Sequence, residues 1–356
     1  MVFSTAKKRI ARNRFTFFLY DVALVFIFLF LLLLPLLALP LIIDEQSVLY
    51  GIMFYTFRMV MVFIGIPLIL YFTNFFFEIQ KKQVIIDEDL SPATGHLKLF
   101  KVSKKNYKYQ ILYGFLIFFL VFLPIDFFTY ILIPEIVEYQ AAVLVIKKTN
   151  YYLSPFINDY FVFLISAIII QISVAITEET ISRGLIAKRG SEYFLSMSAV
   201  MISSLYFGLG HLAYIFDIVA WYPVIWFIQA FIIGLILSII VLRKKWIVPV
   251  IIAHALNNIV SLHTIWSFWQ GISIQTITFF IYIPLFIIGI LFIVDCLLLV
   301  WPMSSIKLGL SNGFKLFKTY FKRDKEEKTL GDSLFRIFFD LLMGCIVFFF
   351  GFAIAI

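Results

Sequence analysis

The sequence predicts an all-α, polytopic integral membrane protein with about nine transmembrane helices. Of the 356 residues, 63% are hydrophobic and only 14% are charged, whereas soluble domains have roughly 25% charged residues. Apolar stretches of about 20 residues, the length that crosses a bilayer as a helix, recur along the whole chain. Short charged segments separate these stretches. The composition therefore excludes an ordinary soluble domain.

Each apolar stretch is expected to form one spanning helix, because backbone polar groups in lipid must find their hydrogen bonds within the segment. The first stretch follows a basic cluster at residues 7–14. It is too long for a signal-peptide core, so we expect it to remain in the mature protein. The predicted spans are residues 17–43, 51–77, 110–133, 159–182, 195–215, 220–242, 246–263, 273–301 and 335–356.

The charges of the loops predict how the chain is oriented. Basic residues dominate the N-terminus, the 79–109 loop and residues 243–245, whereas the loop after the first span is acidic. Basic loops favour the cytoplasmic side, so the N-terminus is predicted to be cytoplasmic and the C-terminus to lie on the outer side. This topology, together with anionic lipid headgroups, explains the formal net charge of +8. No nucleic-acid partner is expected.

The chain divides into three parts on these patterns. Residues 1–154 hold the N-terminal membrane helices and a basic cytoplasmic loop, 155–265 form a polar-containing core, and 266–356 hold the C-terminal helices. Within the last part, residues 303–334 alternate basic and apolar side chains. That pattern indicates an amphipathic helix on the inner leaflet, and a solvated connector is the alternative.

Three polar fragments interrupt the apolar sequence of the core, at residues 178–183, 207–211 and 254–258. Ionisable groups inside a membrane are costly, so a cluster of them is by default a functional site. Each fragment alone has a simpler explanation, namely an ion pair at a helix end or hydrogen bonding between helices. All three occur within about 80 residues, which favours a common site.

The spacing within two fragments suggests separate roles. Glu179 and Arg183 are four residues apart and can pair on one helix face, which leaves the neighbouring Glu178 free. His254 and Asn258 are also four residues apart and share one face. The sequence therefore offers one free carboxylate, and an imidazole beside an amide.

The middle fragment supplies His211, which follows two glycines. Gly208 and Gly210 are expected to permit close approach of a neighbouring helix. In a straight, upright helix counted from Ser191, His211 would lie about 30 Å from the inner surface, too far to meet the other fragments. We therefore expect residues 184–199 to lie partly in the membrane interface, or the helix to tilt strongly.

This set of groups suits the activation of water. A carboxylate with a histidine can act as a general base, and a second histidine with an amide can donate hydrogen bonds to an oxyanion. Alternatively, Glu178, His211 and His254 could bind zinc, with water in the fourth position. Neither a His-Glu-x-x-His nor a Gly-x-Ser-x-Gly motif is present, which disfavours zincin-type and serine hydrolysis. Asn258 is a poor zinc ligand, so a site without a cofactor is favoured and zinc stays the alternative.

In order along the chain, Glu-Glu-x-x-x-Arg, Phe-x-x-x-His and His-x-x-x-Asn resemble the motifs of the CAAX prenyl protease type II and bacteriocin-processing (CPBP, or Abi) family of intramembrane endopeptidases. The similarity covers roughly residues 155–265. It implies that Glu178 and His211 activate the hydrolytic water, and that His254 and Asn258 stabilise the oxyanion.

Glu179 and Arg183 match the remaining motif positions, and the resemblance implies that they support the site. It also implies a conical helical core and an active site near the cytoplasmic side. The family is often labelled as metalloproteases, and a metal-free, glutamate-dependent mechanism is also argued for it. Both possibilities stay open at this point.

The resemblance implies membrane-anchored protein or peptide substrates, with or without a prenyl group. A rival interpretation is a catalytically idle membrane protein of the same fold that acts as an immunity factor or scaffold. A transporter would predict broken midplane helices and inverted repeats, and neither is visible. The sequence does not indicate the oligomeric state.

Several other ionisable residues lie in or near spans and receive no role from the sequence: Arg58, Asp126, Asp295 and Asp340. His96, in a loop, and His263, at a helix end, are interpreted as solvated.

Overall fold

A computed structural model of the protein describes residues 5–81, 84–86, 90–300, 303–322, 327 and 329–353. Within these residues the regular structure is helical and contains no strand. Nine helical segments of the described chain are long and apolar enough to cross a membrane, which confirms the predicted all-α, polytopic membrane class. They are Thr5–Leu41, Val48–Phe77, Tyr107–Leu132, Tyr160–Tyr193, Ser196–Phe216, Tyr222–Lys244, Val248–Trp269, Ile274–Leu299 and Leu330–Ala353.

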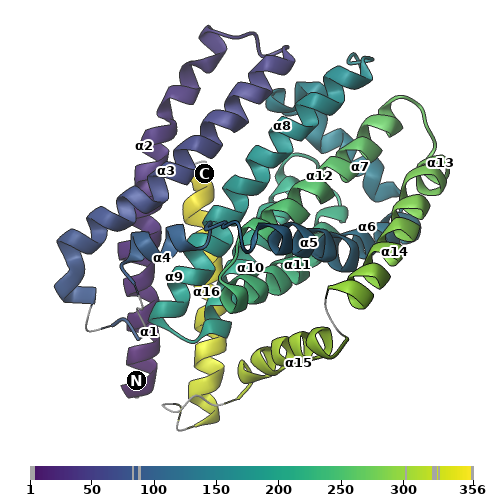
Figure 1. The fold of residues 1–356 in the computed structure, drawn as a ribbon. Coiled ribbons are helices and arrows are strands. Elements are labelled where there is room, and N and C mark those ends of the chain that lie inside the picture. Colours follow the sequence, from purple (N-terminus) through teal and green to yellow (C-terminus); the bar gives the residue numbers. More distant parts are fainter. Residues whose placement is uncertain are drawn as a thin grey trace.

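These segments are built from shorter helical elements, most of which are labelled in Figure 1. Those of the first half are α1 (Thr5–Phe17), η1 (Phe18–Ala23), α2 (Leu24–Leu33), η2 (Leu34–Leu41), α3 (Val48–Lys81), α4 (Pro92–Lys98), α5 (Tyr107–Ile117), η3 (Phe118–Phe122), α6 (Leu123–Leu132), α7 (Glu135–Val145), η4 (Lys148–Leu153), α8 (Tyr160–Glu179) and η5 (Thr180–Ala187). Those of the second half are α9 (Lys188–Tyr193), α10 (Ser196–Leu212), η6 (Ala213–Phe216), α11 (Tyr222–Lys244), α12 (Val248–Trp269), α13 (Ile274–Ile277), η7 (Thr278–Tyr282), α14 (Ile283–Leu299), α15 (Met303–Thr319) and α16 (Leu330–Ala353).

The helices of the polar core lie in the middle of the molecule. In Figure 1, α2 and α3 run along one edge and α14 along the opposite edge, with α8, α10, α11 and α12 between them. α8 contacts both α3 and α12, α12 contacts α5, and α10 contacts α11 and α16. The outer helix α14 exposes Leu291 and Leu298, and large apolar side chains of this kind suit contact with lipid. The arrangement places the three polar fragments among the helices in the middle of the molecule.

The fourth span is longer than the sequence predicts. The prediction ends it at residue 182, but α8, η5 and α9 form one continuous helix to Tyr193, and the chain reverses only at Phe194 and Leu195. η5 is a π-helix, and all its residues are buried. Residues 184–193 thus continue the helix and are mostly buried in the protein; the expected location of residues 184–199 at the membrane interface stays a prediction.

The same reversal brings the first and second polar fragments together. α10 runs back along η5, and the Ser203 hydroxyl donates to the Ser182 carbonyl oxygen at 2.7 Å. Glu178 and His211 lie at similar distances, along the chain, before and after the reversal. A helical hairpin therefore places them at the same level, and no unusual tilt is required.

Close packing in this region depends on small residues. A Cβ atom at Gly208 would come within 3.1 Å of the Phe227 ring on α11, so Gly208 does permit close helix approach as predicted. Gly210 has no such neighbour within 4 Å, and that part of the prediction is wrong.

A segment that the sequence assigned to a loop covers one end of the core. His96 on α4 is only 3% exposed, so its interpretation as a solvated residue is wrong. Its ring lies directly against Gly184, where a Cβ atom would come within 2.8 Å of it. One turn further on, the Leu99 carbonyl oxygen accepts a hydrogen bond from the Ile247 amide at 3.1 Å, just before α12 begins. The segment thus touches η5 and α12 together.

The burial of His96 predicts a pH dependence of stability. Burial lowers the pKa of His96 to about 4, below its ordinary value of 6.5, because the charged imidazolium is disfavoured away from water. The unfolded chain then binds the proton more readily, so stability is intact above about pH 6.5 and is lost as the pH falls towards 4. Between pH 7.5 and pH 5 we expect a loss of about 2 kcal/mol, measured as a fall in melting temperature in detergent. His96→Leu should flatten this dependence, and an unchanged dependence in that variant would contradict the assignment.

The first and last spans are joined by a buried ion pair. Arg14 Nε lies 2.6 Å from Asp340 Oδ1, and both side chains are almost fully buried. Arg14 also donates to the Ser198 hydroxyl at 3.1 Å, and Tyr320 donates to the other oxygen of Asp340 at 3.2 Å. Asp340, which the sequence left without a role, therefore fixes α16 against α1 and α10.

Breaking this pair on one side should destabilise the protein strongly. Arg14→Met leaves the Asp340 carboxylate buried without its counter-charge, and the expected cost is about 3 kcal/mol or more. Thermal unfolding in detergent measures it. The matched control is Arg14→Met with Asp340→Leu, which should recover most of the loss because neither charge remains. Equal melting temperatures for the single and double variants would contradict this account.

The predicted amphipathic segment, residues 303–334, is helical over α15. Arg243 at the end of α11 donates to the Gly309 carbonyl oxygen at 2.6 Å, so α15 is attached to the core. Its location on the inner leaflet stays a prediction. Residues 323–326 and 328 of this segment lie outside the described residues, as do the last position of the predicted eighth span and residues 354–356 of the ninth.

Candidate active site

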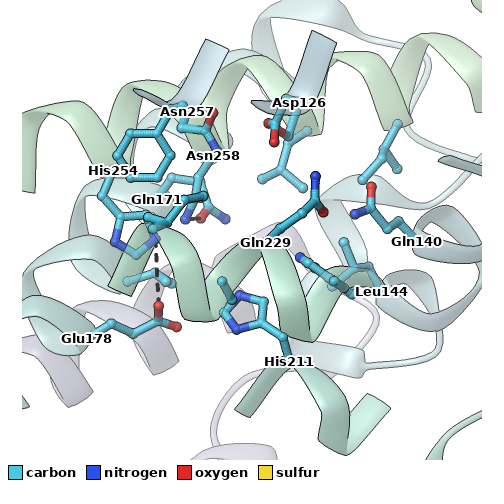
Figure 2. Close-up of a pocket in the computed structure, with 18 of the residues that line it drawn as sticks. Asp126, Gln140, Leu144, Gln171, Glu178, His211, Gln229, His254, Asn257 and Asn258 are labelled. Atoms are coloured by element: carbon cyan, nitrogen blue, oxygen red, sulfur yellow. Dashed lines mark hydrogen bonds and ion pairs between the residues drawn. The ribbon is translucent and has the colours of Figure 1, made fainter. Parts of the chain in front are cut away.

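The three polar fragments meet at one cavity between the helices of the core. Its volume is about 240 Å³, enough for several water molecules or part of a peptide. Glu178, His211, His254 and Asn258 all line it, and Figure 2 shows them at its wall. The two residues with an implied supporting role, Glu179 and Arg183, are fully buried behind that wall.

The adjacent glutamates at the end of α8 have different surroundings. Glu178 faces the cavity with 38% of its side chain exposed, whereas the Glu179 side chain is fully buried. Neighbouring residues on a helix point about 100° apart, so one can face the cavity while the other faces the protein. The sequence-based separation of a free and a paired glutamate therefore agrees with the geometry.

Glu179 and Arg183 form the expected ion pair. Arg183 Nη1 lies 3.1 Å from Glu179 Oε1, and both side chains are fully buried. The guanidinium also lies over the Phe207 ring, with its central carbon 4.2 Å from the ring centroid, and its Nη1 contacts the Ser182 hydroxyl at 2.6 Å. A desolvated guanidinium is stabilised by such a ring in addition to its counter-ion. The pair links the first and second polar fragments.

His254 lies between the two glutamates. Its Nδ1 is 2.8 Å from Glu179 Oε1, and its Nε2 is 3.6 Å from Glu178 Oε2, the contact drawn as a dashed line in Figure 2. The shorter contact is a hydrogen bond in which Nδ1–H donates, because a carboxylate can only accept. The longer one exceeds a direct hydrogen bond. Glu179 therefore orients His254, and Nε2 points at the cavity beside Glu178.

His211 lies at the end of α10 with one ring nitrogen already engaged. Nδ1 is 3.0 Å from the Phe207 carbonyl oxygen, which can only accept, so Nδ1 carries the proton. Nε2 then keeps its lone pair and is free to accept a proton. The ring packs edge-on against Trp226 with centroids 5.3 Å apart, which fixes its orientation in the cavity wall.

Asn258 is held by residues that the sequence analysis missed. Its Nδ2 donates to Gln171 Oε1 at 3.0 Å, and Gln171 Nε2 donates to the Tyr152 hydroxyl at 3.0 Å. A signal for Gln171 existed in the sequence. It is a polar residue two helical turns before Glu178 and therefore on nearly the same face of α8.

Further polar residues line the cavity, and the sequence motifs do not identify them. Asp126, Gln140, Gln229 and Asn257 lie around it in Figure 2, and Ser261 donates to Asp126 Oδ2 at 2.8 Å. These side chains come from α6, α7, α11 and α12. They make the cavity far more polar than its apolar helices suggest, so it can hold water next to the glutamate.

The arrangement of donors does not match a metal site. Among the described residues, no group of three or more His, Cys, Asp or Glu side chains lies close enough to hold a metal ion. Glu178, His211 and His254 share the cavity wall without forming such a group. No step of the chemistry below is therefore assigned to zinc.

The fold and the cavity define a helical membrane protein with a carboxylate and two histidines around a cavity between its helices. Residues 160–260 match the family model described as Type II CAAX prenyl endopeptidase Rce1-like. The match confirms the family resemblance for this segment, which contains every residue of the three motifs. No curated protein and no solved structure matches the chain.

Proposed function

We propose that this protein is an intramembrane endopeptidase that hydrolyses peptide bonds of membrane-anchored proteins or peptides. The observation that carries the proposal is the meeting of Glu178, His211 and His254 at one polar cavity between membrane-spanning helices. The matched family is a protease family, which supports the same class of reaction. Whether the substrate carries a prenyl group is left to experiment.

Glu178 and His211 activate the attacking water in this proposal. Glu178 faces the cavity, and among the described residues its one ion-pair contact is the 3.6 Å approach of His254, so its carboxylate is available as a base. His211 presents the lone pair of Nε2 to the same space, because Nδ1 donates to the backbone. A carboxylate and an imidazole on one water can take its proton and later return it to the leaving amine.

His254 and Asn258 stabilise the oxyanion of the tetrahedral intermediate. Glu179 accepts from Nδ1–H of His254 and so holds the ring with Nε2 towards the cavity, where the protonated ring can donate Nε2–H to developing negative charge. Asn258 is oriented by Gln171 and offers the second donor. Donors fixed before the reaction need no reorganisation during it, which is why such groups contribute strongly to the rate.

The orientation of the protein completes the proposal. With the basic N-terminus and the 79–109 loop on the cytoplasmic side, the covering segment around α4 also lies there. The cavity is then reached from within the membrane or from its cytoplasmic face. Substrates would be peptides or proteins whose scissile bond lies at that depth.

The experiment is cleavage of a membrane-extracted substrate pool by purified protein, wild type beside Glu178→Ala, with and without a chelator. We expect products that disappear in the variant and persist after chelation, because the proposed base is a carboxylate. Mass spectrometry of released peptides measures both. Loss on chelation that zinc restores would overturn the metal-free route. Identical products from wild type and variant, or none from either, would favour an idle scaffold or immunity protein.

A further inference from the structure

An arginine lies within the third helix of the structure, far from either end of its membrane-spanning part. Arg58 follows the start of α3 at Val48 by ten residues, which is about 15 Å along the helix axis. An arginine keeps its charge under all ordinary conditions. Charged residues at such a depth are rare and mark binding or transport sites unless they are paired.

Arg58 is half-buried and, unlike the buried arginines of the described chain, has no carboxylate partner there. Arg14, Arg183 and Arg336 each lie within 3.1 Å of a carboxylate oxygen. In the described part of the chain, no carboxylate forms an ion pair with Arg58, and its Nε is buried without a hydrogen-bond partner. A guanidinium has five N–H donors, so this side chain has a large unused capacity for an anion.

Arg58 adjoins the space where the proposed reaction takes place. Arg58 lines the cavity of Glu178, His211 and His254. It also lines a second cavity of about 480 Å³ that shares Tyr55, Glu178 and His211 with the first. The two hollows are therefore neighbours, and Arg58 lies where both meet the reacting groups. A short peptide could therefore have its anionic group at Arg58 and its scissile bond beside Glu178.

We propose that Arg58 is a binding site for a carboxylate group of the substrate peptide. The inference rests on the proposed function for the identity of the ligand as a peptide. A peptide offers two kinds of anion, a C-terminal carboxylate and an aspartate or glutamate side chain, and both match the planar fork of a guanidinium. Glu178 does not fill this place, because its nearest ion-pair contact among the described residues is His254.

The consequence is specificity for the position of the cut. A carboxylate held by Arg58 fixes the distance between the anion and the bond in front of Glu178. Peptides that carry the anion a few residues after the scissile bond are then aligned for attack. Peptides without the anion can bind with any of several bonds in front of Glu178. Arg58 acts on alignment and is not itself part of the proton transfer.

The test is a binding measurement that does not require cleavage. Full-length protein with Glu178→Gln is placed in phosphatidylcholine nanodiscs, and a dansyl-labelled apolar hexapeptide is titrated by fluorescence. Three probes are compared: the free acid, its C-terminal amide, and an amide with one glutamate side chain before the end. The variants are Arg58→Gln and Arg58→Lys, and the matched control is Asp126→Asn, another ionisable residue of the same cavity.

We expect the free acid to bind about 10- to 100-fold more tightly than the amide, as for a hydrogen-bonded ion pair. Arg58→Gln should remove this preference while affinity for the amide stays unchanged. Arg58→Lys should keep part of the preference, and Asp126→Asn all of it. If the glutamate probe binds like the free acid, a side-chain carboxylate is also accepted. If it binds like the plain amide, the site recognises the chain terminus.

Equal affinities of acid and amide for the protein with Arg58 would overturn the proposal, as would a preference that survives Arg58→Gln. If phosphatidylglycerol added to the nanodiscs abolishes the preference, a lipid phosphate occupies Arg58 in place of the peptide carboxylate, and this result would also overturn the proposal. The binding test of the Arg58 site and the cleavage test of the proposed function can fail independently of each other. A carboxylate preference without any hydrolysis by wild type would reject the proposed function alone, and hydrolysis without the preference would reject the Arg58 site alone.

Discussion

Replacement of Glu178 by glutamine should reduce the turnover of a cleaved peptide by about 10³-fold, the scale of a lost general base. Glutamine keeps the shape of the side chain but cannot take a proton from water. Glu178 is 38% exposed to the cavity, and its contact with His254 is 3.6 Å, so the variant should fold normally. We expect kcat to fall while KM and the melting temperature stay close to wild type. Steady-state kinetics and thermal unfolding on the same preparation measure all three.

The neighbouring glutamate provides the matched control. Glu179→Gln changes the same chemical group one position along the chain, but Glu179 is fully buried and contacts both Arg183 and His254. It should lower the melting temperature, because Arg183 loses its counter-charge, and should reduce activity less than Glu178→Gln. If Glu178→Gln keeps more than about a tenth of the activity, Glu178 is not the base. If the two variants have the same pattern of effects, the division of roles between them is wrong.

The second large effect is expected at Arg183. Arg183→Met leaves the Glu179 carboxylate fully buried without a counter-charge, and breaking a buried pair from one side costs about 3–5 kcal/mol. The variant also loses the contact of the guanidinium with the Phe207 ring. We expect a large fall in melting temperature and loss of activity, since Glu179 orients His254. Thermal unfolding in detergent, with and without a substrate peptide, measures the effect.

Adding Glu179→Gln to Arg183→Met tests the cause. The double variant has no buried charge, and glutamine can still accept a hydrogen bond from His254 Nδ1. It should regain most of the lost stability, because the cost comes from the uncompensated charge. A double variant as unstable as the single one would show that packing of the arginine, and not its charge, maintains this part of the core.

Much of the fold follows from the sequence for a simple reason. An apolar stretch of about 20 residues has few alternatives to a spanning helix, so the existence of each span was predictable even where its ends were not. The polar residues of the site were also predictable, because an ionisable side chain in a membrane span has a high free-energy cost and so indicates a functional site. The three fragments were found in this way, and the structure places all four candidate catalytic residues, Glu178, His211, His254 and Asn258, at one cavity.

The fourth span was predicted too short because charged residues near its end form ion pairs within the protein. Lys188 and Arg189 lie beyond the predicted end of the fourth span at residue 182. In the structure, Arg189 is buried on α9 and pairs with Asp21 at 3.4 Å, and Lys188 pairs with Glu192 at 2.5 Å. A window along the sequence shows these charges without their partners, which lie on another helix or one turn away. The fourth span was therefore ended too early, and the depth of His211 was miscounted.

Other parts of the site depend on tertiary structure from the start. His96 and Leu99 cover the core from a segment far away in sequence, and Arg58 reaches the cavity from α3. Nothing in their immediate neighbours distinguishes them from ordinary loop or span residues. The partner of Asp340 is likewise more than 300 residues away in the sequence, so no local pattern could have indicated the ion pair.

The π-helical turns of η5 also determine where length changes in the gene can be accepted. Each residue of an α-helix contributes about 100° of rotation and 1.5 Å of rise, and a π-helical segment holds more residues per turn. Deleting one residue from η5 would restore ordinary winding and rotate all that follows relative to Glu178, so that α10 would return with His211 facing another direction. Insertions and deletions should therefore be lethal to function between Glu178 and His211, yet harmless in the connection between α2 and α3. A library of single-codon deletions across this region, assayed for activity, would show which changes in length keep Glu178 and His211 facing each other.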